Sequence, residues 1–412
     1  MSDNITINTG QEGSALDQIK AYGSRLKSGE MGALPAIGAL ILLVALFSTL
    51  SPYFLTVMNF ANLLNQAATL MMLSAALVFV IMLGEIDLSA GVTAGTGMAI
   101  FVKLNLEGWP WQASFALAFA LALVTGWVLG YFVAKIGVPS FVVSLALYLA
   151  FPGVALIILG EGGVLRVEVP EIKAIMNTNL PLWGGWALLG VSVALTFAMG
   201  VWDRTRRIKA NLPARPLSLL LAKTGALAVL GSAGVFLLNQ PRSLVAINPI
   251  AGVPTVIPIA VFILFVGTFM LDRTKFGRYM YAVGGNPEAA RRAGIKVAKI
   301  RITAFMICSV LAMVSGVFNV SRIGNVESSA GRAIVLSGVA AAVVGGVSLF
   351  GGRGRLVHAA IGAFVIAIID NGLGLLGMPA GIAYIITGSV LTVAATADAL
   401  ARRRSGGSLT RT

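Results

Sequence analysis

The stretch AATLMMLSAALVFVIMLGEIDLSAGVTAGTGMAIFV, residues 67–102, decides the fold of this chain. It consists of two apolar runs on either side of a short polar break that contains Glu85 and Asp87. A helix needs roughly 20 apolar residues to cross the hydrocarbon core of a bilayer. Because lipid offers no hydrogen-bond partner to exposed backbone groups, such runs are expected to be helical. The stretch therefore predicts two consecutive membrane-spanning helices.

The composition extends this prediction to the whole chain. Of the 412 residues, 57% are hydrophobic and 11% are charged, and the mean hydropathy is +0.90. A soluble domain has roughly 45–50% apolar and about 25% charged residues. The composition therefore excludes a soluble globular protein and a disordered chain, and it indicates a polytopic membrane protein.

Twelve apolar runs are candidate spans. They lie near residues 34–50, 62–84, 88–103, 112–134, 139–160, 182–201, 216–238, 255–271, 299–320, 333–350, 356–376 and 379–399. The predicted fold class is all-α, a polytopic membrane bundle of about 10–12 transmembrane helices. Residues 1–31 lack the basic start and short apolar run of a signal peptide. We therefore expect an N-terminal tail at 1–31, a transmembrane domain at 32–400 and a C-terminal tail at 401–412.

The distribution of basic residues predicts the orientation. With the N-terminus inside the cell, the inner segments hold 23 of the 30 Lys and Arg residues. Cytoplasmic loops of membrane proteins carry such an excess, so both termini are expected in the cytoplasm. The same rule accounts for the net charge of +14 without a nucleic-acid partner. The outer segments hold Lys103, Arg166, Lys173, Arg242, Arg322 and Arg332.

The chain lacks the residue patterns of several kinds of active site. It has one cysteine, Cys308, and one histidine, His358, and neither a CxxC nor an HExxH motif, so no metal site is expected. It also has no GxxxxGK[ST] phosphate-binding motif. We therefore expect that the chain does not hydrolyse ATP by itself.

Residues 272–301, DRTKFGRYMYAVGGNPEAARRAGIKVAKIR, form the largest basic loop. Asn286 suits an N-cap and Pro287 the first helical position, while Glu288 favours the positive end of the helix dipole. Gly294 suits the C-terminal cap. The pattern predicts a short helix of about two turns within the loop.

The side chains of this short helix suit docking into a groove on a partner. Ala289, Ala290 and Ala293 are small, and Arg291 and Arg292 are expected to be exposed. On the residues alone a second interpretation is equally open, because a basic loop can also be held near anionic lipid.

A second informative segment is GGVSLFGGRGR at 345–355. Gly351, Gly352 and Gly354 allow a tight turn, and Arg353 is expected to anchor that turn on the cytoplasmic side.

Polar residues in or beside the spans are candidates for a route through the membrane. A charge at the bilayer centre costs on the order of 2.5–3.5 kcal/mol, so such a residue usually faces a cavity or a partner. For the break GEIDLSAG at 84–91 the alternative is a cytoplasmic turn, and for the amides it is hydrogen bonding between helices. The candidates are Asn62, Asn65, Gln66, Glu85, Asp87, Ser89, Asp370 and Asn371.

Three segments together resemble one family. They are GEIDLSAG at 84–91, AVGGNPEAARRAGI at 282–295 and GGVSLFGGRGRLVHAAIGAFVIAIIDNGL at 345–373. In this order they are similar to the membrane subunits of bacterial ABC importers for monosaccharides of the ribose/xylose type. The extra apolar segments around 182–238 resemble the xylose-type branch, because ribose-type relatives are shorter there.

The resemblance implies a permease of the type II importer kind that works within a complex. Glu288-Ala289-Ala290 with Gly294 would form a coupling helix that docks onto a cytoplasmic ABC ATPase, and that subunit would bind ATP and Mg. The permease would be a homodimer in the bacterial inner membrane, with the solute route near its symmetry axis. A periplasmic sugar-binding protein would deliver xylose or a related monosaccharide, and no cofactor is expected on this chain.

Two other classes of function stay open on the residues alone. A secondary transporter driven by protons or sodium would need an intramembrane carboxylate, for which Glu85, Asp87 and Asp370 are the candidates. A membrane-embedded enzyme would need two spaced carboxylates or a His/Ser pair, and the single His358 disfavours the latter. Within the family, a nucleoside is the nearest competitor of a monosaccharide.

Overall fold

The structure is a computed structural model, and it describes residues 34–404 apart from 161, 213, 215, 243–249 and 330. The expected N-terminal tail at 1–31 and residues 405–412 of the expected C-terminal tail lie outside the described residues.

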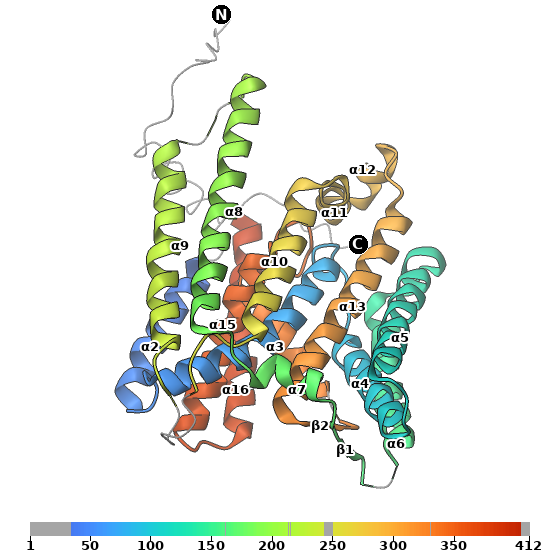
Figure 1. Ribbon diagram of the computed structural model, residues 1–412. Helices are drawn as coiled ribbons and strands as arrows, with labels where there is room; N and C mark the ends of the chain where they lie inside the picture. The colour runs from blue at the N-terminus through green and yellow to red at the C-terminus, as the bar shows by residue number, and fades with distance from the viewer. Residues whose placement is uncertain are drawn as a thin grey trace, which may run out of the picture. The chain divides into compact units, whose positions relative to one another are not determined.

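The described chain is mostly helical (Figure 1). The elements, in chain order, are α2 (Leu34–Leu50), α3 (Val57–Ile81), α4 (Ala90–Leu106), α5 (Trp111–Tyr131), the π-helical turn η1 (Phe132–Ile136), α6 (Ser140–Leu159), β1 (Val164–Arg166), α7 (Pro170–Asn177), α8 (Leu182–Lys209), α9 (Leu217–Leu238), α10 (Val256–Arg273), α11 (Lys275–Gly285), α12 (Pro287–Arg292), α13 (Val297–Ile323), β2 (Asn325–Glu327), α14 (Arg332–Val344), α15 (Leu356–Leu375) and α16 (Ala380–Arg404).

The predicted fold class is confirmed. Among the described residues, eight helices are long and apolar enough to cross a membrane, namely α3, α5 with η1, α6, α8, α9, α10, α13 and α15. The other four expected spans are shorter apolar helices, α2, α4, α14 and the first part of α16. The sequence did not predict the antiparallel ribbon of β1 and β2, in which Val164 pairs with Glu327 and Arg166 with Asn325.

The chain divides into two compact units. Among the described residues, the larger unit consists of 34–178 and 254–402. The smaller unit is formed mainly by the described residues of 179–253. Residues 179–253 are therefore an insertion between α7 and α10, and they include the extra apolar segments.

The larger unit is built around α3 and α13. Helix α13 packs against α3, α4, α5 and α7, and α3 also packs against α14 and α15. Gly126 and Gly130 of α5 lie so close to α13 that a Cβ on either would be 2.6 Å from the Cα of Met306 or Ile302. Small residues permit this approach in lipid, where packing rather than the hydrophobic effect holds helices together.

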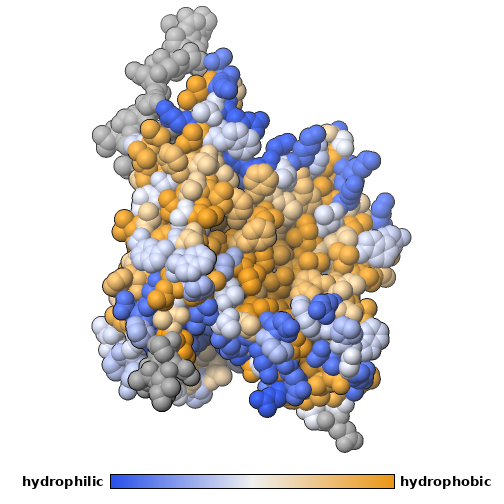
Figure 2. Space-filling model, in the orientation of Figure 1, coloured by the Kyte–Doolittle hydropathy of each residue, from blue (hydrophilic) through white to orange (hydrophobic). Residues whose placement is uncertain are grey.

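The larger unit has two chemically distinct ends. At one, which we call the α12 end, lie α11, α12 and the start of α13, and at the other, the ribbon end, lie β1, β2 and α7 (Figure 1). In the same orientation, Figure 2 shows mostly hydrophobic residues over α10 and α13, and hydrophilic residues gathered toward the two ends. This banding is expected of a bundle whose middle faces lipid and whose ends face water.

Helices α4 and α14 are short and start against each other. Gly91 lies in the first turn of α4, and Gly331 directly precedes α14. A Cβ on either glycine would overlap the carbonyl oxygen of the other. The positive ends of the two helix dipoles therefore meet inside the bundle.

In the smaller unit, α8 and α9 pack as a helical hairpin. Gly231 of α9 lies against Leu189 of α8, and Gly200 of α8 lies against Leu220 of α9. Most other side chains of the two helices are exposed, which suits a hairpin surrounded by lipid.

The chain leaves and re-enters the larger unit at one place. The Thr255 N–H donates to the Thr178 carbonyl oxygen at 3.0 Å, and the two hydroxyl groups lie 2.9 Å apart. Within the smaller unit, the Leu180 N–H donates to the Val253 carbonyl oxygen at 2.8 Å. The two ends of the insertion are thus held side by side.

Candidate functional site

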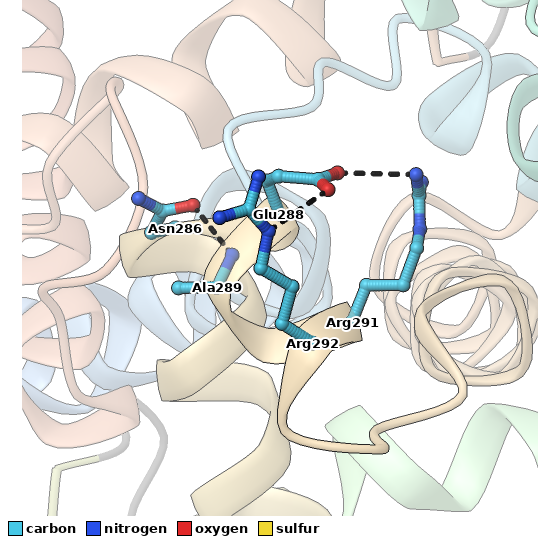
Figure 3. A network of polar contacts seen from close by, with 5 residues as sticks. All are labelled: Asn286, Glu288, Ala289, Arg291 and Arg292. Atoms are coloured by element: carbon cyan, nitrogen blue, oxygen red, sulfur yellow. Dashed lines mark hydrogen bonds and ion pairs between the residues drawn. The ribbon is translucent and has the colours of Figure 1, made fainter.

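The short helix predicted in the basic loop is present as α12 (Figure 3). The Ala289 N–H donates to the Asn286 side-chain oxygen at 2.9 Å, which confirms the N-cap. At the other end Gly294 has a φ of +82°, and the Ile295 N–H donates to the Ala290 carbonyl oxygen at 3.0 Å. These contacts satisfy backbone groups at both helix ends, so α12 is capped at both ends by its own chain.

The exposed face of α12 is charged, and its inner face is small. Glu288 pairs with Arg291 at 3.1 Å and with Arg292 at 3.5 Å, and all three side chains are exposed. Such exposed pairs contribute only about 0–1 kcal/mol to stability. Ala290 is buried in the core of the α12 end and packs the helix against the bundle. The charged side chains lie on the other side of the helix and point to solvent (Figure 3).

Helix α11 connects α12 to the bundle. Its N-terminus is capped by Thr274, whose side chain accepts from the Gly277 N–H at 3.3 Å. The Tyr281 hydroxyl donates to the Gly354 carbonyl oxygen at 2.8 Å. Burial raises the pKa of Tyr281, so its hydroxyl stays protonated and remains a donor at neutral pH.

The 345–355 segment forms the tight bend that its glycines predict. Gly351, Gly352 and Gly354 all have positive φ angles, which side chains with a Cβ rarely adopt. The Ser348 N–H donates to the Arg353 carbonyl oxygen at 3.0 Å and closes the bend.

The break between α3 and α4 is held on several sides. The Glu85 carboxylate and Arg301 Nε, on α13, lie 3.2 Å apart as an ion pair, although the N–H is not aligned for a hydrogen bond. The Ser140 hydroxyl accepts from the Ile86 N–H at 3.1 Å, and the Ser144 hydroxyl donates to the Ile86 carbonyl oxygen at 3.3 Å. The break is therefore fixed to α6 and to α13.

Asp87 lies deeper than Glu85. It is fully buried, and one of its carboxylate oxygens accepts from the Ser89 N–H at 2.8 Å and from the Ser89 hydroxyl at 2.6 Å. The other lies 3.7 Å from the Cys308 sulfur, near the middle of the 27-residue α13. The segment thus runs inward from the α12 end, and α4 begins inside the bundle.

A small cavity lies where α4 and α14 meet, between α3, α4, α13 and α14. Its lining includes Gly91, Gly95, Ser315, Asn319 and Gly331. Its volume of about 20 Å³ has room for roughly one water molecule. The cavity is thus too small for a sugar.

The other predicted polar residues lie at the far ends of α3 and α15 from the break. Asn371 and Asn59 exchange two side-chain hydrogen bonds of 2.9 Å, and both are buried. Asn65 donates to the Met176 carbonyl oxygen at 3.3 Å. The remaining members, Asn62, Gln66 and Asp370, are exposed or half-buried.

Replacing Asn371 by leucine should lower the free energy of unfolding by about 1–3 kcal/mol, because the buried Asn59 amide would lose both hydrogen bonds with Asn371 and keep only its bond to the Phe54 carbonyl oxygen. The double replacement Asn59→Leu/Asn371→Leu should cost less than the sum of the single ones. The measurement is the midpoint temperature of aggregation in detergent. Asn62→Leu, an exposed change on the same helix, is the control, and equal small shifts in all variants would contradict the pairing.

The structure thus divides the sequence-derived polar residues into two groups. Asn65 and Ile81, at the end of α3, are separated by about 24 Å of helix, so the two groups do not form one continuous lining within a single chain. No sequence motif indicates a role for Arg301 and Tyr281, which connect the α12 region to the rest of the bundle. The sequence feature that points to such a contact is the excess of basic residues in 272–301 together with the two acidic residues of the break at 84–91.

Comparison with known proteins places the chain in a family. A family profile described as "Branched-chain amino acid transport system / permease component" matches residues 59–395. Over 386 residues the chain is 34% identical to the xylose transport system permease protein of Escherichia coli (strain K12), an alignment that covers 93% of this chain and 95% of that protein. No solved structure matches.

Two further relatives agree with this match. The ribose import permease protein of the same strain is 32% identical over 363 residues, which cover 87% of this chain and 91% of that protein. A probable ABC transporter permease protein of Sinorhizobium fredii (strain NBRC 101917 / NGR234) is 29% identical over 374 residues, 90% of this chain and 91% of that protein. The resemblance found in the three sequence segments is confirmed. The chain belongs to this family of transport-system permease components, as a multi-pass sugar ABC permease of the xylose/ribose type.

Proposed function

We propose that the chain is the membrane permease of an ATP-driven importer for xylose or a closely related monosaccharide. Two copies form the solute route in the bacterial inner membrane, with both termini in the cytoplasm. A separate cytoplasmic ABC ATPase binds ATP and Mg and docks on α12. A periplasmic sugar-binding protein delivers the solute at the opposite side.

The observation that carries this proposal is the geometry of α12. The helix is capped at both ends by its own chain, it is seated by Ala290, and it presents Glu288, Arg291 and Arg292 to solvent. A preformed element loses little conformational entropy on docking. It can therefore act as a rigid handle for a subunit that moves.

The proposed coupling is a switch between two rigid arrangements. The ATPase contacts α12 differently in its open and closed states, and only such differential contacts can shift the permease between outward and inward access. A neutral solute fits the described spans, because their few charged side chains are engaged with neighbours or lie near helix ends.

Uptake into proteoliposomes tests the proposal. Vesicles containing the permease, its copurifying ATPase and the binding protein are given radiolabelled xylose, ribose or uridine, with ATP or with a proton or sodium gradient. We expect uptake of the pentoses only with ATP. Uptake driven by an ion gradient without the ATPase would establish a secondary transporter, and preferential uptake of uridine would establish a nucleoside permease.

Changes in α12 should separate ATP hydrolysis from transport. Glu288→Ala removes a charge from the docking face, and Gly294→Val forces a branched side chain into a φ of +82°. We expect uptake per ATP hydrolysed to fall, and a loss of about 1.4 kcal/mol in docking would also weaken binding of the ATPase about tenfold. Membrane insertion should be unchanged.

The matched control for these variants is Lys296→Ala, an exposed basic residue of the same loop outside α12. It should keep uptake within about twofold of the unmodified protein. If Lys296→Ala and Glu288→Ala behave alike, and both keep the ATPase bound, the loop acts through its general charge and not through α12.

A further inference from the structure

Three glycine-containing segments meet backbone to backbone at the α12 end of the larger unit. Gly284 lies at the end of α11, Gly84 follows α3, and Gly351 and Gly352 lie in the bend before α15. The Gly352 N–H donates to the Met82 carbonyl oxygen at 2.8 Å. We call the four glycines the glycine junction.

At Gly284 and Gly351 a side chain does not fit between these segments. A Cβ on Gly284 would overlap the Met82 carbonyl oxygen and would lie 2.8 Å from the Gly352 nitrogen. A Cβ on Gly351 would lie 2.8 Å from the Gly84 nitrogen and 2.9 Å from the Gly284 carbonyl oxygen. Because the obstructing atoms belong to the backbone, they cannot turn aside as the end of a flexible side chain can.

Two side-chain contacts fasten the same segments on either side of α12. Before α12, the Tyr281 hydroxyl donates to the Gly354 carbonyl oxygen at 2.8 Å. After α12, Arg301 pairs with Glu85 at 3.2 Å. Helix α12 is therefore connected to the bend before α15 through α11 and to the break between α3 and α4 through α13.

These contacts leave α12 little freedom to move alone. If α12 shifts as a rigid handle, either the contacts on both sides of it break or the break at 82–89 moves with it. The far end of that segment leads into Gly91, which lies against Gly331 at the meeting point of α4 and α14. A displacement at the α12 end thus has a short, packed path to the interior of the bundle.

We propose that the glycine junction is the joint that carries movement of α12 to the break between α3 and α4. The proposal rests on the proposed function, because it requires an ATPase that moves α12. Gly284, Gly351 and Gly352 are positioning residues, since they act through the backbone of neighbouring segments.

A pair of adjacent glycines provides a matched test. Gly284→Ala places a Cβ against backbone, whereas Gly285→Ala in the same helix places it in open space, with nothing within 4 Å. Both variants are reconstituted with the ATPase and the binding protein. The readouts are ATPase copurification, stimulation of ATP hydrolysis by loaded binding protein, and uptake per ATP.

For Gly284→Ala we expect normal ATPase copurification but at least a tenfold fall in uptake per ATP and loss of the stimulation. Gly285→Ala should stay within about twofold of the unmodified protein in every readout. Equal behaviour of the two variants would overturn the proposal.

Cross-linking keeps the proposal testable if Gly284→Ala does not fold. In the variant Glu85→Cys/Arg301→Cys, a short bifunctional thiosulfonate joins the break to the start of α13, while the buried Cys308 stays protected. If the two segments move as one body, uptake after cross-linking equals that of the same double-cysteine variant before cross-linking. Uptake that is lost on cross-linking and restored by reductant would show that they slide past each other, and it would overturn the proposal.

Failure of the proposed function gives a different pattern from failure of the joint. If no ATPase drives this chain, the unmodified protein itself shows no dependence of uptake on ATP. If only the joint is wrong, the unmodified protein is ATP-driven and Gly284→Ala transports as Gly285→Ala does.

Discussion

Replacing Gly331 by valine should leave no folded permease in the membrane. Gly331 has a φ of +91°, and a Cβ there would overlap the Gly91 carbonyl oxygen. The conformation alone costs a residue with a Cβ roughly 1–2 kcal/mol, and a β-branched residue is a strong outlier there. Moving α4 away from α14 to make room for the side chain costs further free energy. The total stability of a typical protein is only about 5–15 kcal/mol.

The yield of monodisperse protein in gel filtration of detergent extracts measures this effect. Two control glycines separate its causes. Gly374→Ala introduces a Cβ into open space in an ordinary helix and should be neutral, whereas Gly324→Ala has open space but a φ of +80° and should cost about 1 kcal/mol. A Gly331→Val variant with the yield of Gly324→Ala would mean that α4 and α14 do not touch.

Reversing either charge of the Glu85–Arg301 pair should reduce uptake at least tenfold, and reversing both should restore much of it. The side chains are 13% and 26% exposed, so the pair lies between an exposed pair, worth about 0–1 kcal/mol, and a buried one, whose disruption costs about 3–5 kcal/mol. Glu85→Lys would place two positive charges together in this half-buried site. The measurement is initial uptake rate per folded permease.

The swap Glu85→Arg/Arg301→Glu is the informative variant, because it keeps an ion pair between the two positions while exchanging which of them carries the positive charge. Lys296→Glu makes the same change of charge at an exposed position of the loop and should have little effect. If the swap is as inactive as the single reversals, the two residues act separately and their proximity does not matter for transport.

The features that could be predicted from the sequence are local ones. Asn286, Pro287 and Gly294 define α12 because a cap depends on backbone groups within three or four residues. The spans followed from the length of apolar runs, which lipid imposes on each helix separately. The apolar runs also predict the short helices α4 and α14, but they do not predict that both helices begin inside the bundle.

The contacts that connect the candidate site could not be predicted in this way. Gly91 and Gly331 lie 240 residues apart in the chain, and glycine in a membrane helix is typical of packing wherever it occurs. Asn371 was a candidate for the solute route, but the structure pairs it with Asn59. An amide in a span shows only that a partner is needed, and the partner depends on which helices become neighbours.

The contact between Thr178 and Thr255 makes the insertion removable in one piece. Because these two residues already touch within the larger unit, a glycine linker of a few residues could replace 179–253 without stretching the remaining chain. The same joint could instead receive a foreign module with closely spaced ends, such as a fluorescent reporter. This permease therefore has a site at which a module can be inserted. A variant without α8 and α9 would show whether the larger unit folds and transports without this hairpin.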